Sequence, residues 1–209
     1  MHCMKNILLL LVIACSAATV NAQSKSELTG DAPVTWLGLD FTHMKFIGYA
    51  NQYQDWGDIS NRDLRGKYFG AWNDLFEKEH RKYDVAAAVR RDYVNYATEV
   101  TDDANYNSEA SYFTNDRGDY QLLDKEKISR LVAKYNFRGR KGIGLMFFVE
   151  GMNKDREQAS VWVTFVNMDS KTVIATRRET GHAGGFGFRN YWAKSFYNVL
   201  KDIDIRRYR

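Results

Sequence analysis

The clearest pattern of hydrophobic and polar positions lies in the last third of the chain, between Lys141 and Asp204. Three apolar runs separated by short polar breaks predict three successive strands, over Gly142 to Gly151, Ala159 to Val166 and Thr172 to Thr176. The first run is almost unbroken, which is typical of a strand buried on both faces. After the third run, apolar residues recur with helical spacing and predict an amphipathic helix that carries Tyr191, Trp192, Ser195, Phe196, Val199 and Leu200 on one side.

The preceding part of the chain predicts a first strand followed mostly by helices. Val34 to Phe41 has apolar residues on both faces and therefore favours a central strand. Ser60 and Asp63 have the spacing of a capping box, and the helix that they begin should run to about His80. The remaining segments, in chain order, predict a short helix over Asp84 to Arg91, a half-exposed strand over Tyr93 to Val100, a loop over Thr101 to Asp119, and a helix that begins at Asp124 and ends at Gly139.

Together these elements predict one α/β domain over residues 34–209. Helices between strands imply parallel pairing, whereas the breaks Lys154 to Glu157 and Asp169 to Lys171 are short enough for hairpins and imply antiparallel pairing. We therefore expect a single mixed sheet of about five strands, covered by helices and closed by the C-terminal amphipathic helix.

The first 22 residues predict an export signal. They combine Lys5 with a short apolar run and end in Val20-Asn21-Ala22, which has the form of a signal-peptidase site. Cys15 offers an alternative, because Val12-Ile13-Ala14-Cys15 also fits the pattern at which bacterial lipoproteins are cut and acylated on the cysteine. The first cut gives a periplasmic or secreted protein, and the second gives an outer-membrane lipoprotein held only by its lipid anchor. In both cases residues 23–33 form a polar tether.

Composition excludes several classes of function. Cys3 and Cys15 are the only cysteines and both lie in the leader, so the mature domain has no disulfide and no thiol nucleophile. Without Lys5, 29 of the 30 basic residues remain against 26 acidic ones, and a net charge of +3 spread along the chain does not predict nucleic-acid binding.

Histidine and serine positions give no support to a catalytic or metal centre. His43, His80 and His182 lack the close spacing of zinc ligands, so we expect neither a metal nor a cofactor. Ser195 lies within the last predicted helix, without the Gly-x-Ser-x-Gly elbow of a hydrolase. Glu150 interrupts an apolar strand and is expected to form an ion pair with Arg178 or Arg189. No residue is therefore assigned a catalytic role.

A glycine-rich segment, Gly181-His182-Ala183-Gly184-Gly185-Phe186-Gly187, precedes the last helix, and Arg189 would lie in its first turn. Glycines before a helix N-terminus can cradle a phosphate. However, no strand follows this helix and no Gly-Lys-Ser/Thr is present, so neither a dinucleotide fingerprint nor a Walker A loop is indicated. The glycines are expected to let the chain turn from the sheet into the helix. The alternative is that they bind a small anionic ligand or an acidic segment of a partner.

Aromatic residues make up 14% of the chain, which fits either an aromatic-rich core or a surface that stacks on sugars or a partner protein. The long segment Thr42 to Gly57 is rich in them, and long loops are often functional. If this loop and the glycine-rich segment emerge at one edge of the sheet, they form a ligand- or partner-binding surface from Tyr49, Tyr53, Trp56, Gly184, Gly185, Phe186 and Arg189.

The order of elements, and the stretch Phe165 to Ile174 in particular, resembles one group of exported envelope proteins. These are small α/β domains related to the curli-secretion channel lipoprotein, the penicillin-binding-protein activator lipoprotein and the N-terminal domain of the TolB protein. The resemblance covers Val34 to Ile203 as topology, but the glycine after the strand-ending Asp is missing here. It implies a non-enzymatic protein that acts by protein contact.

The expected function is therefore that of an exported binding or accessory protein of the cell envelope. Its partner is expected to be an envelope protein. The alternatives are a glycan-binding module that uses exposed aromatic side chains and a hydrolase with an unrecognised site. The sequence gives no indication of the oligomeric state.

Overall fold

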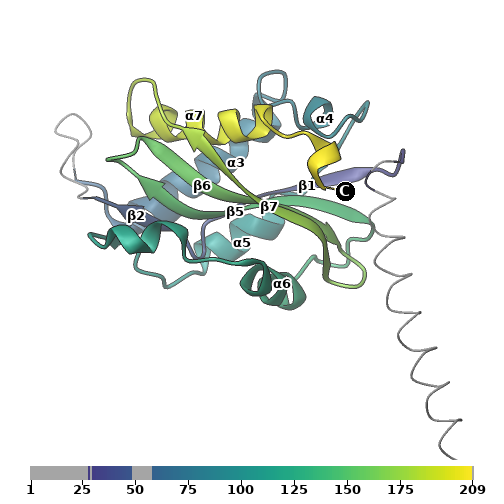
Figure 1. The fold of residues 1–209 in the computed structure, drawn as a ribbon, viewed down its shortest axis with the longest axis horizontal. Coiled ribbons are helices and arrows are strands. Elements are labelled where there is room, and N and C mark those ends of the chain that lie inside the picture. The colour runs from purple at the N-terminus through teal and green to yellow at the C-terminus, as the bar shows by residue number, and fades with distance from the viewer. Residues whose placement is uncertain (1–27, 29, 49–57, 209) are drawn as a thin grey trace, which may run out of the picture.

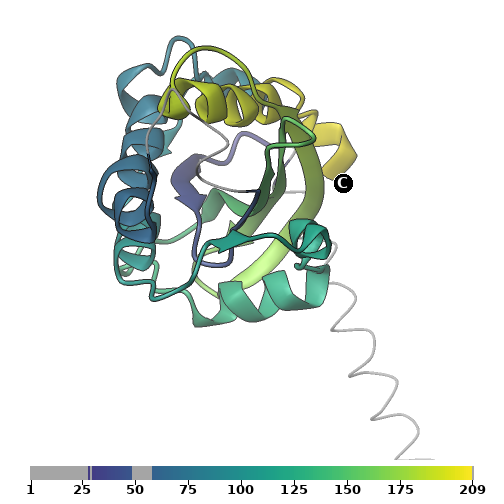
Figure 2. The same ribbon diagram turned by 90° about the vertical axis from the view of Figure 1, so that its left-hand side faces the viewer.

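A curled mixed sheet lies between two layers of helices in the computed structural model, which describes residues 28, 30–48 and 58–208 (Figures 1 and 2). The strands are β1 (Val34–Asp40), β2 (Lys45–Ile47), β3 (Asn95–Tyr96), β4 (Phe113–Thr114), β5 (Ile143–Asn153), β6 (Gln158–Asn167) and β7 (Thr172–His182). The helices are α2 (Asn61–Asp63), α3 (Phe69–Lys78), α4 (Val85–Ala88), α5 (Glu99–Tyr106), α6 (Lys125–Lys134) and α7 (Phe188–Lys201). In addition, η2 (Leu64–Tyr68) is a π-helical segment, and η3 (Arg117–Gln121) and η4 (Ile205–Tyr208) are 3₁₀ helices.

β5 is the centre of the sheet. On one side it pairs in parallel with β1 and then with β2, which lie end to end along it, and these pair in parallel with β3 and β4. On its other side β5, β6 and β7 form two antiparallel hairpins. The expected single α/β domain with a mixed sheet is therefore confirmed, with parallel pairing from crossovers and antiparallel pairing from short turns.

Both faces of the central strands are buried, as their apolar runs predict. One face packs Trp36, Phe147 and Phe165 against α3 and α7, and the other packs Phe148 and Trp162 against α6. Ser60 and Asp63 form the expected capping box at the start of α2. None of the described helices is both long enough and apolar enough to cross a membrane.

Two predictions are corrected around α5. The sequence predicts a strand over Tyr93 to Val100 and a loop over Thr101 to Asp119, but the strand is only the short β3 and a helix begins at Glu99. Short pieces β4 and η3 also fall within the expected loop. The prediction failed because Thr101 and Asn105, which are polar residues typical of loops, are buried in α5 and form hydrogen bonds with the backbone at the end of β1.

Three buried polar side chains take the place of a neighbouring strand along the outer edge of β1. Asn73 of α3 accepts a hydrogen bond from the Leu39 N–H at 2.7 Å. Asn105 of α5 accepts one from the Phe41 N–H at 2.7 Å and donates to the Leu39 carbonyl at 2.8 Å. Thr101 donates to the same strand. Because these hydrogen bonds supply partners for buried backbone groups of β1, they hold α3 and α5 in place at the end of the strand.

Three boundaries also differ from the expected ones. β7 continues to His182, so Gly181 lies within the strand, and α6 ends at Lys134, before Gly139. Leu28, in the segment expected to be a tether, is fully buried in the core. Arg91 holds this segment by donating to the carbonyls of Leu28 and Ala32 at 3.1 and 3.0 Å.

Candidate functional site

Four of the seven residues that the sequence assigns to a binding surface lie in the described part of the chain, around the connection from β7 to α7. They are Gly184, Gly185, Phe186 and Arg189. The other three, Tyr49, Tyr53 and Trp56, lie outside the described residues, as does Cys15 with the whole leader. The predicted meeting of the two segments therefore stays a prediction. The segment Thr42 to Gly57, which the sequence predicts as a long loop, contains the short strand β2.

Three of the four glycines of this segment, Gly181, Gly185 and Gly187, serve backbone geometry, as the first interpretation expected. A Cβ atom on Gly181 would lie 2.0 Å from the carbonyl oxygen of Ser195, so only glycine lets α7 approach β7 so closely. Gly185 and Gly187 have φ angles of +106° and +78°, which glycine adopts without strain. The chain leaves the sheet and enters the helix by these conformations.

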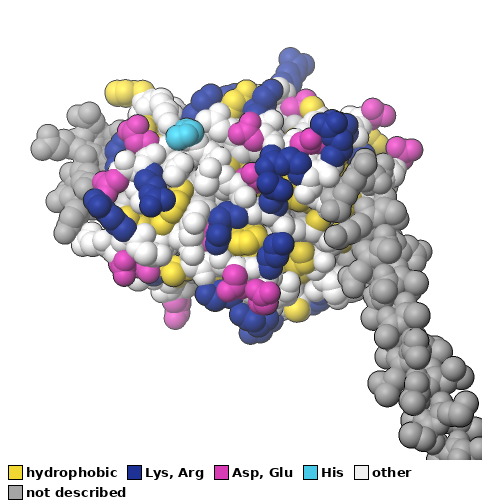
Figure 3. Space-filling model, viewed as in Figure 1, with side chains coloured by type: hydrophobic (Ala, Val, Ile, Leu, Met, Phe, Trp, Pro, Cys, Tyr) yellow, Lys and Arg dark blue, Asp and Glu magenta, His cyan; other side chains and the backbone are white. Residues whose placement is uncertain are grey.

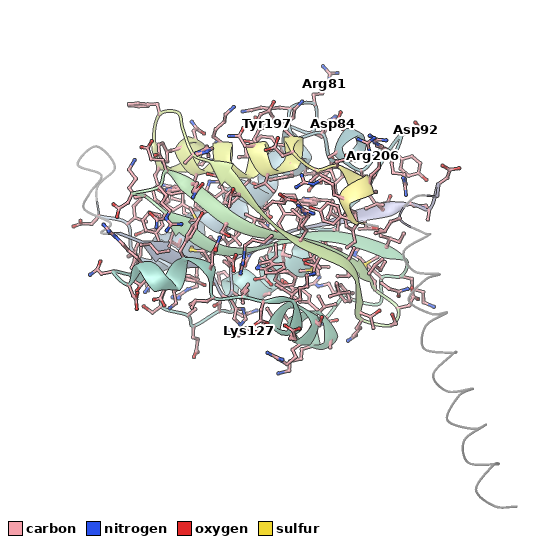
Figure 4. The ribbon with its side chains drawn as sticks, in the orientation of Figure 1. Arg81, Asp84, Asp92, Lys127, Tyr197 and Arg206 are labelled. Atoms are coloured by element: carbon pink, nitrogen blue, oxygen red, sulfur yellow. The ribbon has the colours of Figure 1, made fainter. Side chains whose placement is uncertain are left out.

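The segment borders a groove with a volume of about 490 Å³, which we call the joint groove. Its lining combines the start of α7 and the segment before it with the end of α3 and the turn that follows; the residues are Leu75, Glu79, Lys82, Tyr83, Gly184, Gly185, Arg189, Asn190, Ala193, Lys194 and Tyr197. Three of the four predicted residues in the described part of the chain therefore line one groove. Figure 3 shows the charged side chains on one face of the molecule. Figure 4 shows the position of one lining residue, Tyr197, on α7.

The backbone and the side chain of Arg189 have separate roles. Its carbonyl oxygen accepts a hydrogen bond of 2.8 Å from the Trp72 indole, which ties the first turn of α7 to α3. Its guanidinium forms only a long contact of 3.4 Å with the Asn190 side chain, and no described carboxylate forms an ion pair with it. The fold thus uses the Arg189 backbone and leaves the charge available at the groove.

The joint groove has a positive charge. Lys82, Lys194 and Arg189 line it, while Glu79 is its single lining carboxylate and lies 3.8 Å from Lys82. Burial raises the pKa of Tyr83 to about 12, so its hydroxyl stays protonated at neutral pH and can donate a hydrogen bond. Groups of this kind favour an anionic ligand.

Phe186 stands beside the groove rather than in it. It is 88% exposed, more than any other large hydrophobic side chain in the described part of the chain. Arg189 also lines a second cavity of about 280 Å³ together with Lys67 and Tyr68, so it separates two adjacent hollows of the surface. An exposed aromatic ring and an available arginine three positions apart in sequence form a composition typical of an interface anchor.

Glu150 has a structural role. It is fully buried and pairs with Arg178, with the Arg178 Nε 2.6 Å from its Oε1, so the first of the two expected partners is confirmed. Its carboxylate also accepts hydrogen bonds from the Leu123 N–H at 3.0 Å and the Ser160 hydroxyl at 2.7 Å. Ser195 is buried in α7, which fits its interpretation as a packed helix residue.

A further cavity, of about 520 Å³, lies on the other side of the sheet; we call it the α5–α6 cleft, and the sequence does not predict it. It lies at the carboxyl end of β1, between α5 and α6, and its lining combines apolar Val100, Ala104 and Leu131 with polar Asp40, His43, Asp103, Lys134 and Tyr135. Ligands of α/β proteins often bind at the carboxyl ends of parallel strands.

A chain of hydrogen bonds crosses the floor of this cleft. The Thr42 hydroxyl lies 2.6 Å from Asp40 Oδ1 and 2.8 Å from His43 Nδ1. It has one proton, which it donates to the carboxylate, so Nδ1 of His43 must donate to the hydroxyl and Nε2 is left as an acceptor in the neutral ring. Burial and the Asp40 carboxylate raise the pKa of Tyr135 well above its usual value, so Tyr135 stays protonated and donates to Asp40 Oδ2 at 3.0 Å.

The sequence indicates part of this hydrogen-bond network. Asp40 lies near the carboxyl end of a predicted central strand, and Thr42 and His43 follow it directly, where functional side chains often occur. Tyr135 is the residue that directly follows α6, is distant in sequence from β1, and has no local signal. Within the described residues, no group of three or more His, Cys, Asp or Glu side chains could hold a metal ion.

The fold, the joint groove and the α5–α6 cleft define a mixed α/β domain with a basic groove on one layer of helices and a cleft at the other. No protein-family model matches the chain, and a search of the curated proteins found no match either.

Proposed function

We propose that this chain is an exported, non-enzymatic binding protein of the cell envelope, and that it contacts an acidic segment of a partner protein at the joint groove. The observation that carries the proposal is that the connection from β7 to α7 presents both Phe186, which is 88% exposed, and the Arg189 guanidinium, which no described carboxylate neutralises. Aromatic and arginine side chains contribute most of the binding energy at many interfaces. The export signal that the first 22 residues predict and the resemblance to envelope proteins support the proposed location.

The double variant Phe186→Ser, Arg189→Ala is expected to lose the partner while its melting temperature stays unchanged, because neither side chain contributes to the core. Loss of an anchor of about 2 kcal/mol weakens binding about thirtyfold. The measurement is the set of envelope proteins that co-purify with a tagged chain, combined with a thermal melt.

Arg81→Ala is the matched control for this variant. Arg81 is an exposed arginine that points away from the body of the molecule in Figure 4 and does not line the joint groove. The proposal requires at least one protein with an exposed acidic segment to be retained by this control and lost by the double variant. Retention of the wild-type chain on a glycan array, with no such protein, would favour a glycan-binding function instead.

A second candidate function is hydrolysis in the α5–α6 cleft. The observation that favours it is the series of hydrogen bonds that links Asp40, Thr42 and His43, which leaves Nε2 of His43 as a base. In that reaction Nε2 takes a proton from a water molecule that attacks an ester carbonyl, and the proton passes to the leaving alcohol as the ester bond breaks. The test uses 4-nitrophenyl acetate: hydrolysis above the buffer rate that His43→Ala removes supports this candidate, and a rate equal to buffer excludes it for this ester.

A further inference from the structure

β7 forms the antiparallel edge of the sheet. It pairs with β6 from Thr172 to His182, and within the described residues no strand pairs with its other side. In Figure 2 it lies at the right of the sheet, with the last helix above it and the teal helices below. The outer edge of such a strand presents N–H and C=O groups that a further strand can bind.

A groove with a volume of about 440 Å³, which we call the edge groove, follows this side of β7. Six successive residues of the strand, from Val173 to Arg178, all line it. Because successive side chains of a strand point to opposite faces, a groove that touches all six must lie against the edge of the strand. The walls come from both layers: Lys125 and Ser129 of α6 on one side, and residues of η4 on the other.

The charged residues that line the edge groove are all basic: Lys125, Arg177, Arg178 and Arg207. Two carboxylates outside the groove form ion pairs with three of these basic residues. Glu150 pairs with Arg178, and Glu179 pairs with both Arg177 and Arg207. Four basic groups against two carboxylates leave the groove positive. In Figure 3, Lys and Arg side chains gather in the middle of the face that β7 crosses in Figure 1.

This charge distribution selects the kind of strand that can bind. A second copy of β7, paired edge to edge, would bring the arginines of the two copies together, and like charges across strands are unfavourable. An extended segment with carboxylates at alternate positions would gain backbone hydrogen bonds from the edge and charge-assisted contacts from the basic walls.

We propose that the edge groove binds an extended acidic segment of another protein as an additional strand on β7. The six lining residues correspond to about 20 Å of strand, which fits about six residues of the bound segment. This site is separate from the joint groove and is tested independently of it.

The experiment uses two synthetic peptides with blocked ends, one alternating Glu and Val over six residues and one with Lys in place of Glu. NMR spectra of the labelled full domain are recorded with each. The Glu peptide is expected to shift the outward-facing amides between Val173 and Arg178 and to slow their hydrogen exchange, and added salt should weaken its binding. The Lys peptide should do neither.

The double variant Arg177→Glu, Arg207→Glu is expected to bind the Glu peptide at least about tenfold more weakly, with Arg81→Glu as the charge-matched control outside the groove. Phe186→Ser, Arg189→Ala should bind it as the wild type does, which separates this site from the joint groove. Equal shifts by both peptides, shifts confined to other elements, or no shift at millimolar peptide would each overturn the proposal. Concentration-dependent shifts of β7 without peptide would overturn it in favour of self-association.

Discussion

A chain that ends before Phe188 is expected to show no cooperative thermal unfolding, because α7 supplies a large part of the core. Trp192, Phe196 and Val199 are fully buried against the sheet and α3. Truncating one buried aromatic side chain costs about 3 to 5 kcal/mol, and a domain of this size is stable by only about 5 to 15 kcal/mol. Circular dichroism recorded during heating measures the outcome.

Two substitutions within α7 serve as graded controls for the truncation. Phe196→Ala is expected to lower the free energy of unfolding by about 3 to 5 kcal/mol, whereas Lys194→Ala, on the exposed side of the same helix, should change it by less than about 0.5 kcal/mol. If the truncated chain melts cooperatively near the original temperature, α7 is an appendage and its placement in the core is wrong.

Glu150→Ala is expected to destabilise the domain by about 3 to 5 kcal/mol. Glu150 is fully buried, so its removal leaves Arg178, which is only 32% exposed, without its partner and leaves the buried Leu123 N–H without an acceptor. The measurement is denaturant unfolding at neutral pH.

Asp155→Ala is the matched control, because it breaks an ion pair with Arg117 whose side chains are 44% and 78% exposed. Exposed pairs contribute at most about 1 kcal/mol. Equal and small effects of the two substitutions would show that the Glu150 pair adds nothing beyond an exposed one.

The sequence predicted the parts of the fold that depend on apolar periodicity. β1, β5, β6 and α7 fall where their apolar runs predict them, since burial on both faces or on one side leaves a direct pattern. α5 was missed because its buried side includes Thr101 and Asn105, whose roles depend on backbone groups of β1 that are distant in sequence. A local pattern carries no information about such partners.

The candidate sites show the same limit. Glycine spacing and the nearby aromatic and arginine residues indicated the joint groove, although the contribution of α3 and of Tyr83 could not be predicted locally. The edge groove depends on which strand ends the sheet, and the α5–α6 cleft depends on Tyr135 meeting Asp40 across the fold. Both follow from topology rather than from any single segment.

The most direct test of the binding proposal is photocrosslinking in intact cells with benzoylphenylalanine placed at position 186. Tyr106, which is 73% exposed on α5, is the matched control position because its ring is also solvent-accessible. We predict a discrete adduct with an envelope protein from position 186, none from position 106, and loss of the adduct when Arg189→Ala is added. The same adducts from both positions, or none from position 186, would contradict the proposal that the joint groove is the contact surface.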